Sequence, residues 1–279
     1  MTRLPISGST RLAGVIGTPV RHSLSPAIHN AAYQECGLDW VYVALEVGEG
    51  QANAALAGMR ALGITGLSVT MPHKDAAFAA VDELSPAARS MRAVNCVHLE
   101  NGLLVGHNTD GDGFVDSLRS DAGVEPRGLS VVVIGAGGAA RSVIEALGRS
   151  GAASVSVINR TPERASEAST LAGSVGRVGS WDDVNGADLV VNATSVGLGG
   201  QGMPVSASLL RNGQVVADLV YHPLETPLLA AARAVGARAV DGLGMLVHQA
   251  AHQFRIWTGV EPPVAVMRRA ALAELSRRG

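Results

Sequence analysis

Apolar and polar positions along the first hundred residues predict short strands that alternate with amphipathic helices. Runs of aliphatic residues indicate strands, and apolar residues at three- and four-residue spacing indicate helices. Ser25 followed by Pro26 favours a helix start, because the hydroxyl can cap free N–H groups and proline suits the first turn. Asn101 and Gly102 lie between two apolar runs and predict a tight hairpin turn. The expected strands are 12–17, 41–47 and 66–70, and the expected helices are 26–35 and 51–62.

The pattern becomes more regular after residue 110 and predicts a doubly wound parallel sheet. The polar stretch 120–128 is typical of a connection. Strand–helix alternation with one antiparallel hairpin predicts an α/β chain whose first sheet is mixed, and the length is that of about two domains. The expected strands are 130–134, 154–158, 188–192, 215–219 and 237–240, and the expected helices are 113–120, 139–149, 244–258 and 264–277.

The composition excludes some classes of function. The 279 residues carry 22 Lys and Arg side chains against 24 Asp and Glu, and this net charge of −2 argues against binding of nucleic acid. Only 3% of residues are aromatic whereas 34 are glycine, which is typical of tightly turned α/β layers. Cys36 and Cys96 form no CxxC pair and fit a reducing compartment. Because no apolar stretch reaches the length of a signal core or a membrane span, we expect a cytoplasmic protein without a membrane partner.

A glycine-rich turn follows the expected strand 130–134. Gly135, Gly137 and Ala140 match the GxGxxA form of the dinucleotide-binding fingerprint, in which the residues permit the turn, the approach of pyrophosphate and the packing of helix on strand. The helix that starts here would offer free N–H groups to phosphate. Such a string is weak evidence alone, but its place between a strand and a helix favours a dinucleotide over a plain glycine turn. The candidate contacts are Gly135, Ala136, Gly137, Gly138 and Ala139.

The end of the next strand favours NADP(H) over NAD(H). Asn159 stands 24 residues after Gly135, where an NAD site usually places a carboxylate for the ribose 2′-hydroxyl. The chain offers instead Asn159, Arg160 and Thr161, with Arg164 one turn further on. Guanidinium groups and a hydroxyl would bind a 2′-phosphate that a carboxylate would repel. Two solvated arginines at a helix start are the alternative interpretation, although positive charge opposes the helix dipole there.

Polar residues gather at the ends of the expected strands and hairpin in the first half, where ligands bind in open α/β sheets. Singly, such residues are more often caps or turn formers, but several clusters beside a dinucleotide fold favour a ligand site. Hydroxyls, amides, an ammonium and a carboxylate suit a small polyhydroxylated ligand that itself carries a carboxylate. The candidates are Ser23, Ser25, Thr70, Lys74, Asn95, Asn108 and Asp110.

The order and spacing of these motifs resemble the shikimate dehydrogenase family over essentially the whole chain. One departure is Ser68, at a position where the family often has asparagine. The matching segments are HSLSP at 22–26, VTMPHK at 69–74, GHNTDGDG at 106–113, GAGGAA at 135–140, NRT at 159–161, NATSVGL at 192–198, DLVYHPLETPLL at 218–229 and GLGMLVHQAAHQF at 242–254.

The resemblance implies NADPH-dependent, reversible reduction of 3-dehydroshikimate to shikimate in chorismate and aromatic amino acid biosynthesis. It implies Lys74 and Asp110 as the catalytic pair, which agrees with the need for a cationic proton donor where hydride addition builds charge on oxygen. It further implies an N-terminal mixed α/β substrate domain (1–110 and 243–279), a Rossmann-like NADP-binding domain (111–242) and C-terminal helices that return to the first domain. The implied substrate contacts are Ser23, Ser25, Thr70, Asn95, Tyr221 and Gln249, and the implied nicotinamide neighbours are Val220, Gly242 and Met245.

Several alternatives stay open. A paralogue that acts on quinate or an aminoshikimate would need only a small change of pocket. A non-catalytic NADPH-binding regulator would be expected to lack Lys74 or Asp110, and a methylene-folate dehydrogenase would need an aromatic-rich pterin pocket that the sequence does not supply. His248 and His252 have the spacing of a zinc helix, but Gln249 replaces the glutamate of that motif, so we expect no metal. The expected assembly is a monomer or homodimer.

Overall fold

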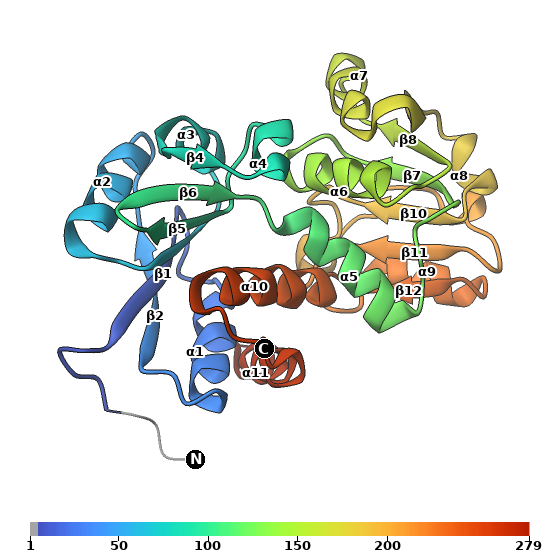
Figure 1. Cartoon of the computed structure of the whole chain (residues 1–279). Helices are drawn as coiled ribbons and strands as arrows, with labels where there is room; N and C mark the ends of the chain where they lie inside the picture. The colour runs from blue at the N-terminus through green and yellow to red at the C-terminus, as the bar shows by residue number, and fades with distance from the viewer. Residues whose placement is uncertain (1–4, 279) are drawn as a thin grey trace. The chain divides into compact units, whose positions relative to one another are not determined.

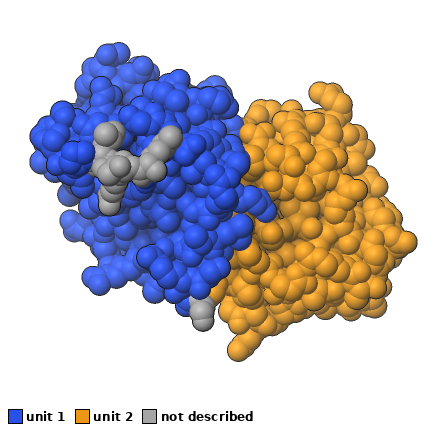
Figure 2. Space-filling model, turned by 90° about the horizontal axis from the view of Figure 1, so that it is seen from below, with its two compact units in different colours: residues 1–109, 249–279 blue, residues 110–248 orange. Residues whose placement is uncertain are grey.

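A computed structural model describes residues 5–278 of the chain, and these residues form two compact units (Figures 1 and 2). Unit 1 (residues 1–109 and 249–279, blue in Figure 2) is assembled from both ends of the sequence, and unit 2 (residues 110–248, orange) is continuous. The predicted functional domains, 1–110 with 243–279 and 111–242, divide the chain a few residues away from these units and stay a prediction. Their outermost residues, 1–4 and 279, lie outside the described part.

Unit 1 is built on a mixed sheet of six strands in its described part. β1 is parallel to β2 and β3, whereas β5 is antiparallel to β3 and β6. Asn101 (φ 51°) and Gly102 (φ 82°) form the turn between β5 and β6, which confirms the predicted hairpin. The spatial order is β2 (Trp40–Glu46), β1 (Arg11–Gly17), β3 (Gly66–Val69), β5 (Cys96–Glu100), β6 (Leu103–His107) and β4 (Glu83–Leu84).

The helices of unit 1 come from both ends of the sequence. The last helix, α11, packs against the first, α1, which confirms the predicted return of the C-terminal helices to the first domain (Figure 1). The helices are α1 (Ser25–Glu35), α2 (Ala52–Leu62), α3 (Lys74–Ala80), α4 (Pro86–Met91) and α11 (Val264–Arg278), together with residues 249–258 of α10 (Gly242–Thr258).

The prediction that Ser25 caps α1 is wrong. Leu24 already has helical dihedral angles (φ −85°, ψ −11°), so Ser25 lies inside the first turn rather than in the extended geometry that a capping side chain needs. The hydroxyl of Ser23 accepts a hydrogen bond from the Ser25 backbone N–H at 3.2 Å instead. The side chain of Ser25 is therefore left for other contacts.

Two different cores cover the two faces of the unit 1 sheet. Aliphatic side chains of the strands, among them Ile16 and Leu67, pack against α2, α3 and α4. Aromatic side chains gather on the opposite face, where the ring of His29 stacks on Tyr42 with centroids 4.4 Å apart. Trp257 of α10 lies against the same two rings, and its indole N–H donates to the Val97 carbonyl oxygen at 3.1 Å. Most of the aromatic residues of unit 1 thus gather where α10 meets the sheet: Tyr33, Trp40, Tyr42, Phe254 and Trp257.

Unit 2, of which every residue is described, contains a parallel sheet of six strands. β7 and β10 are neighbours in the middle of the sheet, and the strands that follow each of them run outward in opposite directions. This is the order of a Rossmann-type sheet, whose ligand crevice opens at the carboxyl ends of the two central strands. The spatial order is β12 (Arg238–Val240), β11 (Val215–Asp218), β10 (Leu189–Asn192), β7 (Ser130–Ile134), β8 (Ser154–Ile158) and β9 (Gly176–Val178).

Helices cover both faces of the unit 2 sheet, which confirms the doubly wound prediction. Val131 and Val133 belong to one buried cluster with α5 and α6, whereas Val132 and Ile134 belong to a second cluster with α9, as expected of a strand buried on both faces. The helices are α5 (Asp110–Ala122), α6 (Gly138–Arg149), α7 (Pro162–Ser169), α8 (Asp183–Gly186) and α9 (Pro227–Ala234), with short 3₁₀ turns at Thr170–Val175, Leu198–Gly200 and Ala207–Leu209.

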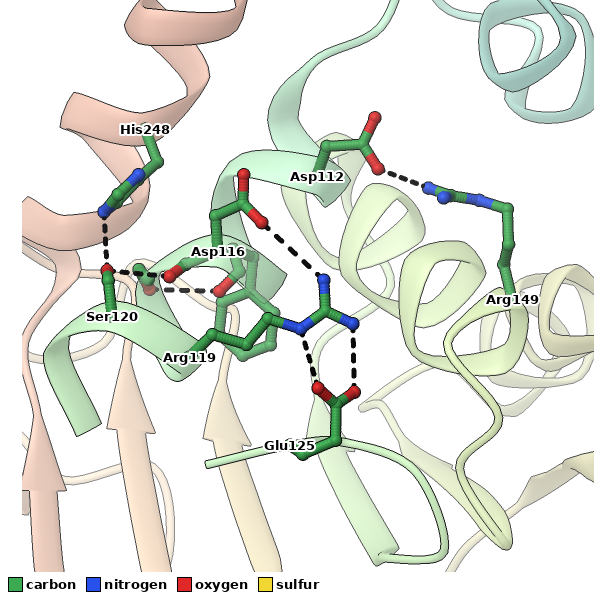
Figure 3. A network of polar contacts seen from close by, with 9 residues as sticks. Asp112, Asp116, Arg119, Ser120, Glu125, Arg149 and His248 are labelled. Carbon is green, nitrogen blue, oxygen red and sulfur yellow. Dashed lines mark hydrogen bonds and ion pairs between the residues drawn. The ribbon is translucent and has the colours of Figure 1, made fainter. Parts of the chain in front are cut away.

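A polar network holds α5 against its neighbours in unit 2 (Figure 3). Arg149 of α6 pairs with Asp112 at 2.7 Å, and Arg119 pairs with Glu125 at 2.9 Å. The hydroxyl of Ser120 shares a hydrogen bond of 2.8 Å with His248 in α10. These exposed ion pairs contribute little to stability, typically up to about 1 kcal/mol each, so the packing of α5 on α6 depends mainly on the buried side chains of Phe114, Val115 and Leu118.

Candidate active site

The glycine turn after β7 lies at the central crevice of the unit 2 sheet. Gly135 has a φ of +116°, and a Cβ there would lie 2.8 Å from the carbonyl oxygen of Ala193, which follows β10. Its backbone N–H donates to the Ile158 carbonyl oxygen of β8 at 2.8 Å. Glycine is therefore required at position 135 both by backbone conformation and by the close approach of two strand ends.

The next glycines leave space at the start of α6. Gly137 is the N-cap residue and Gly138 the first helical residue, and a Cβ on either would meet no other described atom within 4 Å. The first backbone N–H groups of a helix have no partner within the helix, so open space at the start of α6 suits a pyrophosphate. Ala140, by contrast, is fully buried against the sheet, so the three positions of the fingerprint have the environments predicted for them.

Positive side chains gather at the end of β8. The Asn159 side chain donates to the Thr161 carbonyl oxygen at 3.0 Å and shapes the turn into α7. Arg160, Thr161 and Arg164 are exposed, and neither arginine forms an ion pair with any residue from 5 to 278. Two unpaired guanidinium groups beside a hydroxyl offer the donors that a phosphate ester needs.

A polar cluster lies at the ends of β10 and β11, across the crevice of the unit 2 sheet from β8. Thr226 and Asn192 donate to the two oxygens of buried Asp218 at 2.7 and 2.8 Å, and the Val220 N–H donates to it at 3.1 Å. Burial raises the pKa of the Asp218 carboxyl, and these hydrogen bonds oppose the rise.

The chain after β11 approaches the start of α10 closely. The Gly242 N–H donates to the Val220 carbonyl oxygen at 3.3 Å, and a Cβ on Gly242 would lie 2.3 Å from the carbonyl oxygen of Leu219. Tyr221, half-buried, follows in the same loop, and Met245 is buried one turn further along α10. The three predicted nicotinamide neighbours, Val220, Gly242 and Met245, therefore belong to one continuous part of unit 2.

Unit 1 brings several predicted substrate contacts to one edge of its sheet. Thr70 and Asn95 are joined through the end of β3: the Thr70 N–H donates to the Ile16 carbonyl oxygen at 3.0 Å, and the Val69 N–H donates to that of Asn95 at 2.7 Å. The Asn95 side chain accepts from the Thr109 N–H at 2.8 Å and donates to the Thr109 hydroxyl at 3.1 Å. Thr109 directly precedes Asp110, the first residue of α5.

The loop that carries Lys74 is held by the backbone of its neighbours. Lys74 begins α3, and its carbonyl oxygen accepts from the Val94 N–H at 3.1 Å. The Asn108 side chain donates to the Ala93 carbonyl oxygen at 3.1 Å in the same region. The Lys74 side chain is half-buried at this edge. Of the remaining candidates, Ser23, Ser25 and Gln249 belong to unit 1, whereas Asp110 and Tyr221 belong to unit 2.

Two buried residues that the sequence did not single out, Tyr42 and Gln253, lie beside the candidate residues of unit 1. Gln253 is 1% exposed and hydrogen bonds Gln249 at 2.8 Å, and Tyr42 is 1% exposed and donates to the Ser68 hydroxyl at 2.6 Å. The available signal was a second glutamine four residues after Gln249, on the same face of one helix.

Two further sequence expectations concern a metal site at His248 and a membrane span. His248 hydrogen bonds Ser120, and among residues 5–278 no three His, Cys, Asp or Glu side chains gather as a metal site would require. The helices in that range are all too short or too polar to cross a bilayer.

Known proteins are similar to this chain over nearly its full length. Family models match residues 15–97 (shikimate dehydrogenase substrate binding domain), 121–197 (shikimate / quinate 5-dehydrogenase) and 242–272 (shikimate 5′-dehydrogenase C-terminal domain). A shikimate dehydrogenase (NADP⁺) of Geobacter sp. strain M21 is 46% identical over 99% of both chains. A shikimate dehydrogenase crystallised with NADP⁺ has a TM-score of 0.92 at 39% identity, covering 97% of this chain and 98% of its own. The shikimate 5-dehydrogenase of Thermus thermophilus, crystallised with NADP(H) and shikimate, has a TM-score of 0.90 at 38% identity, covering 95% and 100%.

Proposed function

The chain belongs to the shikimate dehydrogenase family, and from this premise we propose that it interconverts 3-dehydroshikimate and shikimate with NADP(H). The observation that carries the proposal is the extent of the similarity, since a curated NADP-type relative matches 99% of the chain. The reaction belongs to the biosynthesis of chorismate and the aromatic amino acids.

Lys74 is the proton donor in this proposal. It is the one lysine of the 279-residue sequence, in which the other strongly basic side chains are all arginine. A guanidinium stays protonated at physiological pH, whereas an ammonium can give its proton to a developing alkoxide and take one back in the reverse direction. The occurrence of the only lysine at the predicted catalytic position supports a role in proton transfer rather than in charge alone.

The residues of the pair divide the chemistry between them. Bound NADPH supplies the hydride that adds to the carbonyl carbon of the substrate. As the carbonyl π electrons move to oxygen, Lys74 Nζ donates a proton to that oxygen, which leaves a neutral amine and an alcohol. Asp110 orients the ammonium and shares its proton, and the amine is reprotonated from solvent after the product leaves. The oxidation of shikimate runs through the same steps in reverse.

Substitution of Lys74 tests this assignment. Lys74→Ala should lower turnover by about two to four powers of ten, the usual weight of an acid–base group, while shikimate affinity weakens only modestly. Lys74→Arg, which keeps the charge but holds its proton too tightly to act as a general acid at physiological pH, should also be strongly impaired. The matched control is Asp75→Asn, an exposed neighbour in α3 that should leave turnover unchanged. Normal turnover in Lys74→Ala would end the assignment.

The cofactor proposal rests on the glycine turn that follows β7 and on the two arginines that follow β8. The open space at Gly137 and Gly138 fits a pyrophosphate, and unpaired Arg160 and Arg164 fit the 2′-phosphate of NADP(H). The double variant Arg160→Ser/Arg164→Ser should raise KM for NADP⁺ by about ten- to a hundredfold, because charge-assisted hydrogen bonds are lost. KM for NAD⁺ is the internal control, since NAD⁺ has no 2′-phosphate. An equal rise for both cofactors would contradict the proposed role.

The substrate contacts are proposed as Ser23, Ser25, Thr70, Asn95, Tyr221 and Gln249, which would bind the hydroxyls and carboxylate of shikimate. A paralogue that acts on quinate is the second candidate, favoured by the name of the matched central family model. The ratio of kcat/KM for shikimate and quinate, measured with both cofactors, separates the two candidates. Absence of turnover with either substrate would favour the non-catalytic regulator.

The assembly and location complete the proposal. We propose a monomer or homodimer, which light scattering of the purified chain would determine. Cys36 and Cys96 form no disulfide bond among the described residues, which supports a reducing, cytoplasmic compartment; cell fractionation tests this location.

A further inference from the structure

A chain of hydrogen bonds crosses the buried interior of unit 1 from β2 to α10. The Tyr42 hydroxyl donates to the Ser68 hydroxyl at 2.6 Å, and the Ser68 hydroxyl donates to the side-chain oxygen of Gln253. The Gln253 amino group donates in turn to the side-chain oxygen of Gln249 at 2.8 Å. Tyr42, Ser68 and Gln253 are 1%, 7% and 1% exposed, so water does not compete with these bonds.

The direction of every bond in this chain is fixed. A carbonyl oxygen only accepts, and the Gln253 amino group also lies 3.4 Å from the backbone carbonyl of Asn95 and 3.3 Å from the Thr109 hydroxyl. The Gln253 side-chain oxygen must therefore face Ser68, and the Ser68 hydroxyl must donate its one hydrogen to that oxygen. Ser68 then accepts from Tyr42. A flip of the Gln253 amide would break bonds at both of its ends at once.

The far end of the chain is a predicted substrate contact. Because the Gln249 oxygen accepts from Gln253, the amino group is the end of Gln249 that Gln253 does not use. An amino group is a pure donor and recognises an accepting oxygen, such as that of a hydroxyl or carboxylate. Burial raises the pKa of Tyr42, and its hydrogen bond with Ser68 opposes the rise, so the hydroxyl stays a proton donor.

We propose that Tyr42, Ser68 and Gln253 are positioning residues that preset the Gln249 amide as a hydrogen-bond donor to an oxygen of the substrate. The proposal rests on the proposed function, since it assigns Gln249 to substrate binding. None of the three touches the reacting atoms in this role. They hold the Gln249 side-chain amide in one of its two orientations before the substrate binds. Less conformational entropy is then lost on binding.

Removal of the Tyr42 hydroxyl tests the proposal. Tyr42→Phe should raise KM for shikimate about fivefold, the worth of one ordinary hydrogen bond, with less than about a twofold change in kcat and none in KM for NADP⁺. In a Gln249→Ala background the same substitution should have no further effect on KM. The matched control is Tyr33→Phe: the Tyr33 hydroxyl is equally buried but has no hydrogen-bond partner among the described residues, so its removal should leave KM unchanged.

A second pair of variants separates positioning from a loss of structure. Ser68→Ala should raise KM as Tyr42→Phe does, while Ser68→Thr, which keeps the hydroxyl, should retain most of the wild-type affinity. Side-chain amide resonances of Gln253 and Gln249 in ¹⁵N-labelled protein should shift in Ser68→Ala but not in Tyr33→Phe, whatever substrate the enzyme uses.

The outcomes distinguish this proposal from the proposed function. If the wild-type protein does not oxidise shikimate, the proposed function is wrong. The amide resonances then still decide whether the hydrogen bonds from Tyr42 to Gln253 orient Gln249. A KM effect of Tyr42→Phe that persists without Gln249, or equal effects of Ser68→Ala and Ser68→Thr, would overturn the positioning role.

Discussion

Acidification should destabilise unit 1 through His29. This side chain is fully buried, stacked on Tyr42, and neither ring nitrogen has a hydrogen-bond partner among the described residues. Burial lowers its pKa from 6.5 to about 3, because the charged imidazolium would lose its hydration without gaining a partner. In the unfolded chain the same imidazole is solvated and takes up a proton near its ordinary pKa.

The sign and size of the effect follow from the two pKa values. Below pH 6.5 His29 is protonated in the unfolded state, whereas in the folded state it stays neutral until the pH approaches 3. The free energy of unfolding therefore falls as the pH is lowered from 6.5 towards 3. Each pH unit costs about 1.4 kcal/mol. Between pH 8 and pH 5 the loss attributable to His29 is therefore about 2 kcal/mol, a large fraction of a typical domain stability of ~5–15 kcal/mol.

Urea unfolding at the two pH values measures this loss. The signal should be tryptophan fluorescence in a Trp181→Phe background, because the remaining tryptophans, Trp40 and Trp257, both lie in unit 1. The comparison variant is His29→Phe, which keeps an aromatic ring in the stack and cannot titrate. Other groups with lowered pKa values, such as His98 and His107, titrate equally in both proteins and cancel. If both proteins lose the same stability between pH 8 and pH 5, the buried neutral imidazole is not the cause.

Two further substitutions test the packing that surrounds the sites. Gly66→Ala would place a Cβ 2.5 Å from the Trp257 ring and should lower the free energy of unfolding by about 1–3 kcal/mol. In the control Gly58→Ala the Cβ meets no described atom within 4 Å and a helix former replaces glycine, so stability should rise by up to ~1 kcal/mol; equal effects of the two would refute the steric argument. Thr226→Val removes the side-chain cap of α9 and a donor to buried Asp218, and should cost about 1–2 kcal/mol in urea unfolding, whereas an unchanged midpoint would show that neither bond matters.

The sequence predicts those elements of the fold that carry a strong periodic signal. Strands such as Ser130–Ile134 and Ser154–Ile158 match their predicted ranges, because both faces of each are buried and valine and isoleucine recur along them. The short elements were not predicted. Pro86–Met91 is less than two turns long and Gly176–Val178 holds only three residues, so neither offers a full period of hydrophobic positions from which a pattern could be recognised.

Some features of the candidate site could likewise be predicted from the sequence, whereas others could not. The backbone demands on Gly135 and the open start of α6 could be predicted, since the fingerprint states local geometry within a few residues. The contact of Ser68 with Gln253 could not, because 185 positions separate the two and nothing in a one-dimensional pattern tells which face of α10 meets which strand. The Ser25 cap failed for a related reason: its role depends on the dihedral angles of the preceding residue, which amino-acid identity alone does not set.

The division of unit 1 between the two ends of the sequence has a consequence for biosynthesis on the ribosome. Residues 110–248 form unit 2 without interruption and emerge before the helices that complete unit 1. The strands β1 to β6 are synthesised first, but their aromatic face is not fully covered until Phe254 and Trp257 have been synthesised. The domain translated first is thus finished last, and a nascent chain that ends before residue 249 holds a complete second unit beside an open hydrophobic sheet, the species that chaperones would be expected to bind.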